Sequence, residues 1–428
     1  MRRRENQDSI FLHRVRHYFI TILVGQEEKL MKKHLWLIVV SAIGLAFAQS
    51  NDALAQKTLK FGHLNSFSGG TSLYGADSKR AMTIAIEEIN AKGGIQVGGD
   101  RYLLEVVHLD SKYEAADTVA GYRRLVDLHG IHYIHNMGTV TGKAIMPYNE
   151  KDKVLLDIIS PSESLNQTGN KLVLNQVVRP NGYDPPVVRE AVKRGFRNLC
   201  VIADDSDFGK EHTSVIVDAF KQLGGKVLAV EYLKTTTEVD FMPVLTKLKG
   251  FKPDCMYIVT FEEPGIRITK QAREAGITAK FFYCEHFKQK TIDSVGIEHL
   301  EGTLFVGSYS TLSSIPVPGT PEEILDYRNK YLKRWPGEYL SSTGCYGYNW
   351  IYYTTRAMEL AGTVADVYKV RAMASRALKE NSKLKYEGFT EGGRAYGMLT
   401  FVLAIDHGKV RVASMTPYPK ELAELGEK

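Results

Sequence analysis

From residue 57 onward, short strand-like runs alternate with helix-like runs along most of the chain. Apolar and β-branched runs such as 58–64 and 102–110 are each followed by a longer segment with apolar residues at helical spacing. The helix-like segment 78–94 ends at two glycines, a common helix stop signal. Strands that alternate with helices form parallel sheets covered by helices on both faces. The sequence therefore predicts an α/β fold.

Two stretches interrupt this rhythm. Segment 175–186 contains three prolines and a glycine, and segment 307–323 is rich in serine, proline and glycine. The strand–helix alternation restarts after the first stretch. After the second come helical runs near 321–335, 343–361 and 365–380, and then a pair of strands joined at a Gly-containing turn. We expect two α/β units rather than one.

The N-terminus has the organisation of a secretory signal. A basic stretch beginning at Met31 precedes a 14-residue apolar run, 35–48, and Ala53 and Ala55 fit a small-x-small cleavage rule before Gln56, with 46–48 as a second cleavage candidate. A membrane anchor is the alternative, but a span needs roughly 20 apolar residues. No cysteine lies near the cleavage site, which argues against lipid anchoring. We expect residues 1–55 to be an upstream extension plus a cleaved signal, with translation starting at Met31.

Charge and cysteine content exclude other classes. The chain carries a net charge of +6, and removal of residues 1–55, with eight Lys/Arg and five Asp/Glu, leaves +3. So weak an excess argues against nucleic acid as a partner. The four cysteines have no metal-binding spacing and three lie in apolar runs, so we interpret them as buried thiols; a disulfide stays open.

The predicted strands end in residues suited to binding. Ligands of doubly wound sheets bind beyond the carboxyl ends of the strands. Hydroxyls, aromatic rings or acids follow six successive strands, in segments 63–75, 136–142, 159–164, 203–209, 260–265 and 284–287. This repetition across two units predicts a binding cleft between two lobes.

Motifs for catalysis are missing from the sequence. It contains no nucleophile elbow, no zinc-protease motif and no phosphate loop, and segment 138–143 lacks the spacing of the last. Asp204, Asp205 and Asp207 form an acidic cluster that we interpret as solvated rather than metal-binding. We therefore predict neither an enzyme nor a bound metal or cofactor.

One acid stands out from its surroundings. Segment 281–287, FFYCEHF, is typical of a buried strand, yet Glu285 lies near its end. A carboxylate there must face water, pair with a cation or carry a raised pKa. Lys288 and Lys290 are close enough in sequence to be the cation, and a ligand is the other candidate.

Several segments in order resemble one known family. Residues 74–95, 105–126, 206–227 and 240–277 and the C-terminal strand pair resemble bacterial periplasmic substrate-binding proteins of the branched-chain amino acid type, and the resemblance covers nearly all of 57–415. It implies a type I periplasmic binding fold: two doubly wound parallel-sheet lobes joined by a three-crossover hinge. The implied lobes are 56–179 with 310–392, and 180–309 with 393–420.

The resemblance also implies a ligand site. A ligand carboxylate is expected at hydroxyls, aromatic rings are expected to cover the ligand, and Glu285 is expected to hold its ammonium. The residues carried over are Tyr74, Thr139, Thr141, Ser160, Ser162, Ser164, Phe208, Phe261 and Glu285. Two covers that are tyrosine-like in the family are phenylalanines here, and Glu163 adds an acid that either faces the cleft or is solvated.

The resemblance implies an exported, periplasmic solute receptor of an ABC importer that binds an amino acid, branched-chain or similarly apolar, by hinge closure. Its partners are then the small-molecule ligand and a permease in the inner membrane. Members of the family also bind aromatic or aliphatic carboxylates, amides and urea, so these ligands stay open. A ligand-sensing regulatory module and an exported enzyme are the alternatives from other classes.

Overall fold

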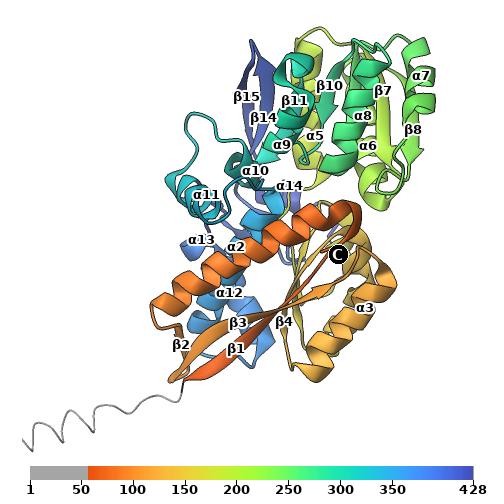
Figure 1. The fold of residues 1–428 in the computed structure, drawn as a ribbon. Helices are drawn as coiled ribbons and strands as arrows, with labels where there is room; N and C mark the ends of the chain where they lie inside the picture. The colour runs from red at the N-terminus through yellow and green to blue at the C-terminus, as the bar shows by residue number, and fades with distance from the viewer. Residues whose placement is uncertain (1–55, 428) are drawn as a thin grey trace, which may run out of the picture. The chain divides into compact units, whose positions relative to one another are not determined.

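The computed structural model describes residues 56–427, and the part from Lys57 onward forms one compact unit (Figure 1). The predicted signal sequence and the predicted start at Met31 lie outside the described residues. Two large sheets organise this unit, each flanked by helices. The predicted fold class is confirmed, with antiparallel strands added at the sheet edges.

The first sheet has six strands in the order β2-β3-β1-β4-β5-β6. All neighbours pair in parallel except β2 with β3. Its strands are β1 (Lys57–Asn65), β2 (Ile95–Val97), β3 (Asp100–Asp110), β4 (Tyr133–Met137), β5 (Leu155–Ile159) and β6 (Val173–Leu174).

Helices cover both faces of this sheet because its central strands are apolar on both sides. On one face Phe61 packs edge-to-face against Trp350 of α12. On the other face Leu64 and Ile134 belong to a separate core with Tyr122 of α3. Figure 1 shows α2 and α3 on opposite sides of the strands. The helices of this lobe are α2 (Ser72–Ala91), α3 (Ala115–Arg123), α4 (Thr139–Asn149), α11 (Glu322–Arg334), α12 (Ser342–Ala361) and α13 (Val367–Asn381).

The second sheet has seven strands in the order β15-β14-β11-β10-β9-β7-β8. The five neighbouring strands β11, β10, β9, β7 and β8 are parallel, and β14 and β15 add an antiparallel edge. Its strands are β7 (Asn198–Asp204), β8 (Lys226–Leu233), β9 (Cys255–Val259), β10 (Lys280–Tyr283), β11 (Leu304–Ser308), β14 (Leu399–Asp406) and β15 (Lys409–Pro417).

Alternate residues of these strands again feed two cores. Val201 and Tyr257 face one core with Val187 and Phe220, whereas Ile202 faces the other. The helices here are α5 (Pro180–Lys193), α6 (Asp207–Gln222), α7 (Met242–Gly250), α8 (Glu262–Glu274), α9 (Gln289–Val295) and α10 (Tyr309–Ser314). The minor elements are β12 (Gly388–Phe389), β13 (Ala395–Tyr396), α14 (Lys420–Ala423), η1 (Gly69–Thr71), η2 (Arg124–Leu128), η3 (Glu163–Leu165) and η4 (Ile297–Leu300).

Three sequence predictions of element boundaries were wrong. The break predicted over 175–186 is shorter, because α5 begins at Pro180, where a helix needs no N–H donor. The break over 307–323 contains the helix α10. The strand expected over 281–287 ends at Tyr283, so Glu285 lies in the turn that follows it. The three hinge crossings stay a prediction.

Two further observations concern export and redox chemistry. None of the helices in the described residues is long and apolar enough to cross a membrane. All four cysteines are free and buried, in agreement with their interpretation as buried thiols.

Candidate functional site

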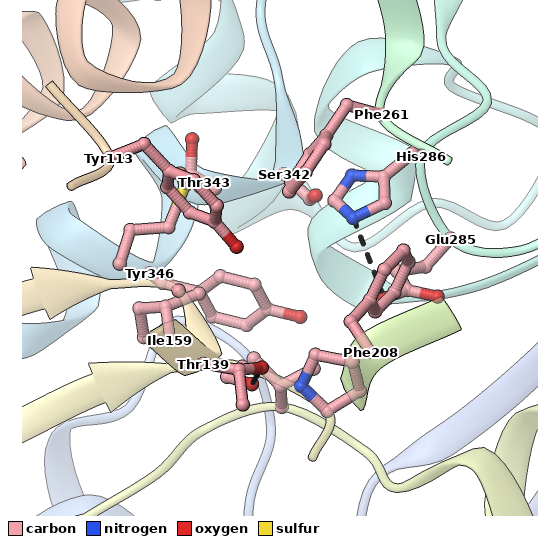
Figure 2. Close-up of a pocket in the computed structure, with 15 residues that line it drawn as sticks. Tyr113, Thr139, Ile159, Phe208, Phe261, Glu285, His286, Ser342, Thr343 and Tyr346 are labelled. Carbon is pink, nitrogen blue, oxygen red and sulfur yellow. Dashed lines mark hydrogen bonds and ion pairs between the residues drawn. The ribbon is translucent and has the colours of Figure 1, made fainter. Parts of the chain in front are cut away.

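A cavity lies where the carboxyl ends of strands from both sheets meet (Figure 2). The volume of the cavity is about 30 Å³, room for two or three waters. Its walls are mostly apolar and aromatic, with a few hydroxyls and a single acid. The lining residues are Tyr113, Met137, Gly138, Thr139, Ile159, Ser160, Pro161, Val177, Phe208, Phe261, Glu285, His286, Ser342, Thr343 and Tyr346.

Hydroxyl groups form the wall of the first lobe. Thr139 opens α4 directly after β4, and Gly138 makes the turn with φ 111°, a conformation that favours glycine. The Oγ1 atom of Thr139 lies 2.7 Å from Oγ of Ser160, which follows β5. Ser160 Oγ also accepts a hydrogen bond from the Ser162 N–H. Hydroxyls beside the N-terminus of a helix can donate to an anion.

The start of α12 adds further hydroxyls from far along the chain. Ser342 and Thr343 lie in its first turn, which is capped by Ser341. Tyr346 lies one turn later, and its OH accepts a hydrogen bond from Oγ of Ser310. This wall is buried and polar, so it can orient a ligand with hydrogen-bonding groups.

Aromatic rings form a second wall, three of them from the second lobe and one, Tyr113, from the first. Phe208 and Phe261 are stacked, with ring centroids 5.7 Å apart and planes at 23°. His286 lies 5.1 Å from Phe261 and 5.4 Å from Phe208, and Tyr113 meets Phe261 edge-on at 5.4 Å. Burial lowers the pKa of His286 well below its usual value, so its ring is neutral at pH 7. These four rings (the aromatic wall) offer an apolar surface to a ligand.

Glu285 is the one acid that lines the cavity. It is 5% exposed, and neither carboxylate oxygen has a hydrogen-bond partner within the described chain. Burial raises the pKa of this carboxyl, while the nearby His212 acts to lower it. A buried carboxylate without hydrogen bonds is costly, so this side chain is suited to a donor that enters the cavity.

A hydrogen-bonded chain of three buried side chains, Tyr257, Asp184 and His212 (the relay), lies behind Glu285. Tyr257 donates a hydrogen bond of 2.6 Å to Asp184, whose other oxygen lies 2.8 Å from Nδ1 of His212. Nε2 of His212 is 3.6 Å from a Glu285 oxygen. Burial alone would lower the pKa of His212, but Asp184 and Glu285 outweigh it and raise the pKa to about 9. The relay therefore places a protonated imidazole between two carboxyl groups at pH 7.

The two lysines considered as partners for Glu285 are engaged elsewhere. Lys290 pairs with Glu263. Lys288 is fully buried and donates to the main-chain carbonyl of Glu285 rather than to its carboxylate. Burial lowers the pKa of Lys288 and raises that of the nearby Glu262. Neither lysine lines the cavity.

The structure brings five of the nine sequence-predicted site residues to the cavity: Thr139, Ser160, Phe208, Phe261 and Glu285. The remaining four do not line it. Tyr74 lies behind the aromatic wall, where its OH accepts a hydrogen bond from the Glu262 N–H and contacts Nδ1 of His286. It therefore supports Phe261 and His286 rather than facing the cavity.

The other three hydroxyls bond within the protein. Thr141 Oγ1 donates to the main chain just before α4, at Met137 O and Gly138 O. Ser162 and Ser164 bond to each other, and Ser162 Oγ also donates to Glu211. These side chains shape the loops without facing the cavity.

Glu163 does not face the cleft. One of its oxygens lies 2.9 Å from the Arg179 guanidinium, and the other accepts from Asn181 Nδ2. It therefore cannot repel a ligand carboxylate directly. The acidic cluster is also accounted for, because Asp204 accepts from Thr235, Asp205 pairs with Lys210, and Asp207 pairs with Lys143.

Sequence reasoning missed ten lining residues. His286 neighbours a predicted residue, and Ser342, Thr343 and Tyr346 belong to a helix that no strand-end rule would select. No group of three potential metal ligands forms anywhere in 56–427.

Comparison with known proteins places the chain in a family. A sequence profile described as "Periplasmic binding protein" matches residues 58–408. The Leu/Ile/Val-binding protein of Escherichia coli K12 is 25% identical over 272 residues, 62% of this chain and 71% of that protein. The Leu/Ile/Val/Thr-binding protein of Salmonella typhimurium is 26% identical over 265 residues, 61% of this chain and 70% of its own length. The chain belongs to the periplasmic binding protein family, and the resemblance to its branched-chain amino acid type is confirmed.

Solved structures confirm the fold. A leucine-binding protein from Thermotoga maritima superposes with a TM-score of 0.70 at 22% identity, covering 85% of this chain and 99% of that one. A solute-binding protein of an ABC transporter from R. palustris, in complex with benzoate, gives 0.72 at 13% identity, covering 84% and 97%. Proteins with the type I periplasmic binding fold thus include a leucine-binding protein and one solved with an aromatic acid. The family supplies the solute-binding components of ABC transporters.

Proposed function

We propose that this protein is the solute receptor of an ABC importer and binds an apolar amino acid between its two lobes. The observation that carries the proposal is the buried Glu285 carboxylate, which faces the cavity with both oxygens unpartnered. An α-ammonium group supplies three donors and a compensating charge. A ligand without a donor at this point would leave the carboxylate without a hydrogen bond.

The two walls divide the remaining recognition. Thr139 and Ser160, beside the N-terminus of α4, receive the ligand carboxylate. Phe208 and Phe261 receive the apolar side chain. A ligand that contacts both walls bridges the lobes, so its binding free energy favours the closed form.

Closure also engages groups that do not line the cavity. Glu211 of α6 accepts hydrogen bonds from Ser162 Oγ and from the Glu163 N–H, and Lys143 of α4 pairs with Asp207. Because the cavity has room for only two or three waters, an amino acid enters when these contacts open. The protein then alternates between an open form that loads and a closed form that docks on a permease.

An aromatic carboxylate is the second candidate ligand. The aromatic wall favours it, and solved relatives include complexes with benzoate and 4-hydroxybenzoate. Such a ligand uses the same hydroxyl wall but gives Glu285 no ammonium. Export to the periplasm and an inner-membrane permease partner belong to both versions of the proposal.

A thermal-shift screen of the protein beginning at Gln56 tests the proposal. The panel holds aliphatic amino acids, aromatic amino acids, aromatic carboxylates, amides and urea. A true ligand at 100 times its Kd adds about 2.7 kcal/mol of stability and raises the melting temperature by several degrees. Shifts by amino acids alone support the proposal, and shifts by amine-free acids alone select the second candidate. A panel without any shift refutes both.

A further inference from the structure

The proposed carboxylate subsite has no cationic side chain of its own. The cavity-lining residues of the described chain include neither lysine nor arginine, and His286, the one imidazole, is neutral at pH 7. Thr139 and Ser160 offer hydroxyls, and α4 offers a partial positive charge at its first turn. A carboxylate enclosed there still needs a full charge close by to offset its desolvation.

Arg394 lies directly behind this subsite. Its side chain is fully buried, and all three hydrogen bonds of its guanidinium go to main-chain carbonyl oxygens. They are Ser160 O at 3.1 Å, Ser162 O at 2.6 Å and Val177 O at 2.8 Å. Two of these acceptors, Ser160 and Val177, belong to residues that line the cavity.

We propose that Arg394 is a positioning residue of the carboxylate subsite. It turns the carbonyls of Ser160 and Ser162 away from the ligand, and it supplies the positive charge that the lining residues lack. Carbonyl oxygens turned toward a carboxylate would repel it, so their orientation decides whether this loop attracts an anion. The inference rests on the carboxylate subsite proposed above, but it applies to an amino acid and to an aromatic acid alike.

Packing alone does not account for an arginine at this place. Burial lowers the pKa of Arg394 only to about 10, so the group stays charged at pH 7 although its Nε has no partner. A fully buried charge held only by carbonyls is costly, and a neutral side chain of similar size would avoid that cost. The titratable groups around it are Tyr418, Arg179, Glu211 and Glu427.

Arg394 also connects the site to a segment between the lobes. Its main chain forms a parallel bridge with Asn175, and Nδ2 of Asn175 donates to the same Ser160 carbonyl. Asn175 and Arg394 lie near two of the three predicted crossings between the lobes, those at 179/180 and 392/393. The orientation of the binding loop is thereby tied to the geometry of these crossings.

Arg179 provides a matched control. It is also buried, but it donates to Ala423 O and Leu425 O and pairs with Glu163, none of which lines the cavity. The variants Arg394→Gln, Arg394→Lys and Arg179→Gln are compared with the unchanged protein. Circular dichroism and melting temperature establish that each variant is folded.

The readout is the preference for an acid over its amide. Calorimetry gives the Kd of L-leucine against L-leucinamide and of benzoate against benzamide. We expect Arg394→Gln to reduce the acid-to-amide preference by roughly 10- to 30-fold, because glutamine removes the unit positive charge behind the subsite. Arg394→Lys retains most of the preference, and Arg179→Gln leaves it unchanged.

A purely structural role would weaken acid and amide equally, and that result overturns the proposal. An equal loss of preference in Arg179→Gln overturns it as well. If Arg394→Gln does not fold, the pH dependence of Arg394→Lys tests the proposal instead. The preference of this variant for benzoate over benzamide falls as pH is raised, because the buried lysine amine loses its proton, whereas the protein with arginine keeps its preference. Binding of benzoate but not leucine refutes the amino-acid function and leaves Arg394 testable; binding of neither acid refutes both.

Discussion

Replacement of Glu285 by glutamine separates binding from stability. The variant keeps the size of the side chain and one carbonyl acceptor but removes the negative charge. The carboxylate is 5% exposed and its oxygens lack hydrogen bonds, and its nearest cation, His212, lies 3.6 Å away, beyond the length of a hydrogen bond. The charge is therefore available to a ligand ammonium.

The expected loss follows from simple electrostatics. Two unit charges about 3 Å apart at an effective dielectric of about 20 attract by about 5 kcal/mol. Desolvation of both groups and the bond that glutamine still accepts reduce this to about 2–3 kcal/mol, a 30- to 150-fold weaker Kd. The assay is isothermal titration with the amino acid that gives the largest thermal shift.

We expect Glu285→Gln to affect the stability of the fold in the opposite sense to its effect on ligand binding. Burial raises the pKa of Glu285, so the folded protein holds this proton more tightly than the unfolded chain does. Stability is then lost as pH rises from the pKa of the unfolded chain through the folded pKa, so this carboxyl destabilises the fold wherever the unfolded chain is ionised. Glu285→Gln removes that penalty, and we expect an equal or higher melting temperature without ligand.

Glu263→Gln is the control, because Glu263 pairs with Lys290 and does not line the cavity. It leaves Kd within threefold. Unchanged amino-acid affinity in Glu285→Gln would refute the ammonium role. A large fall in melting temperature would instead assign Glu285 a structural part.

The remaining predictions concern the aromatic wall, acid sensitivity and the thiols. Phe208→Ala weakens binding of an apolar ligand by about 1.5–3 kcal/mol in calorimetry, whereas Ser164→Ala, off the cavity, changes Kd less than threefold. His63 and His108 bond through their Nδ1 atoms, and burial lowers the pKa of His63 and brings that of His108 to about 4. As pH falls, both histidines are protonated in the unfolded chain before they are protonated in the folded protein. The free energy of unfolding, measured with denaturant, therefore falls by on the order of 2 kcal/mol between pH 6.5 and 4, and by less in His108→Gln; a flat pH profile contradicts this. Reductant leaves the melting temperature within about 1 °C because the four cysteines are free, and a fall of several degrees would reveal a disulfide.

Much of the fold could be predicted because the central strands of both sheets are buried on two faces. Runs such as 199–203 and 255–259 are apolar throughout, and glycines end the helices between them. The boundaries near Pro180 were harder. Proline stops a helix from within but also starts one at its first position, and composition alone does not separate the two cases.

Glu285 could be found from sequence because an acid directly after an apolar strand conflicts with its surroundings. Thr141 and Ser162 could not be separated from Thr139 and Ser160 in the same way. All four hydroxyls follow strands, and only the local turn decides which faces the cavity and which bonds to the main chain.

Tyr346 and its neighbours on α12 could not be predicted as site residues for another reason. They reach the cavity because α12 packs against the first sheet from more than 150 residues away in the chain, and no local pattern records that contact. Arg394 was missed likewise, since its function depends on carbonyls of a distant loop.

The most direct test of the account compares L-leucine with 4-methylpentanoate, the same acid without its amine. Calorimetry of the protein beginning at Gln56 measures both Kd values under one condition. The account predicts that leucine binds at least about 30-fold more tightly, because only leucine brings an ammonium to Glu285. Equal or tighter binding of 4-methylpentanoate would contradict the account.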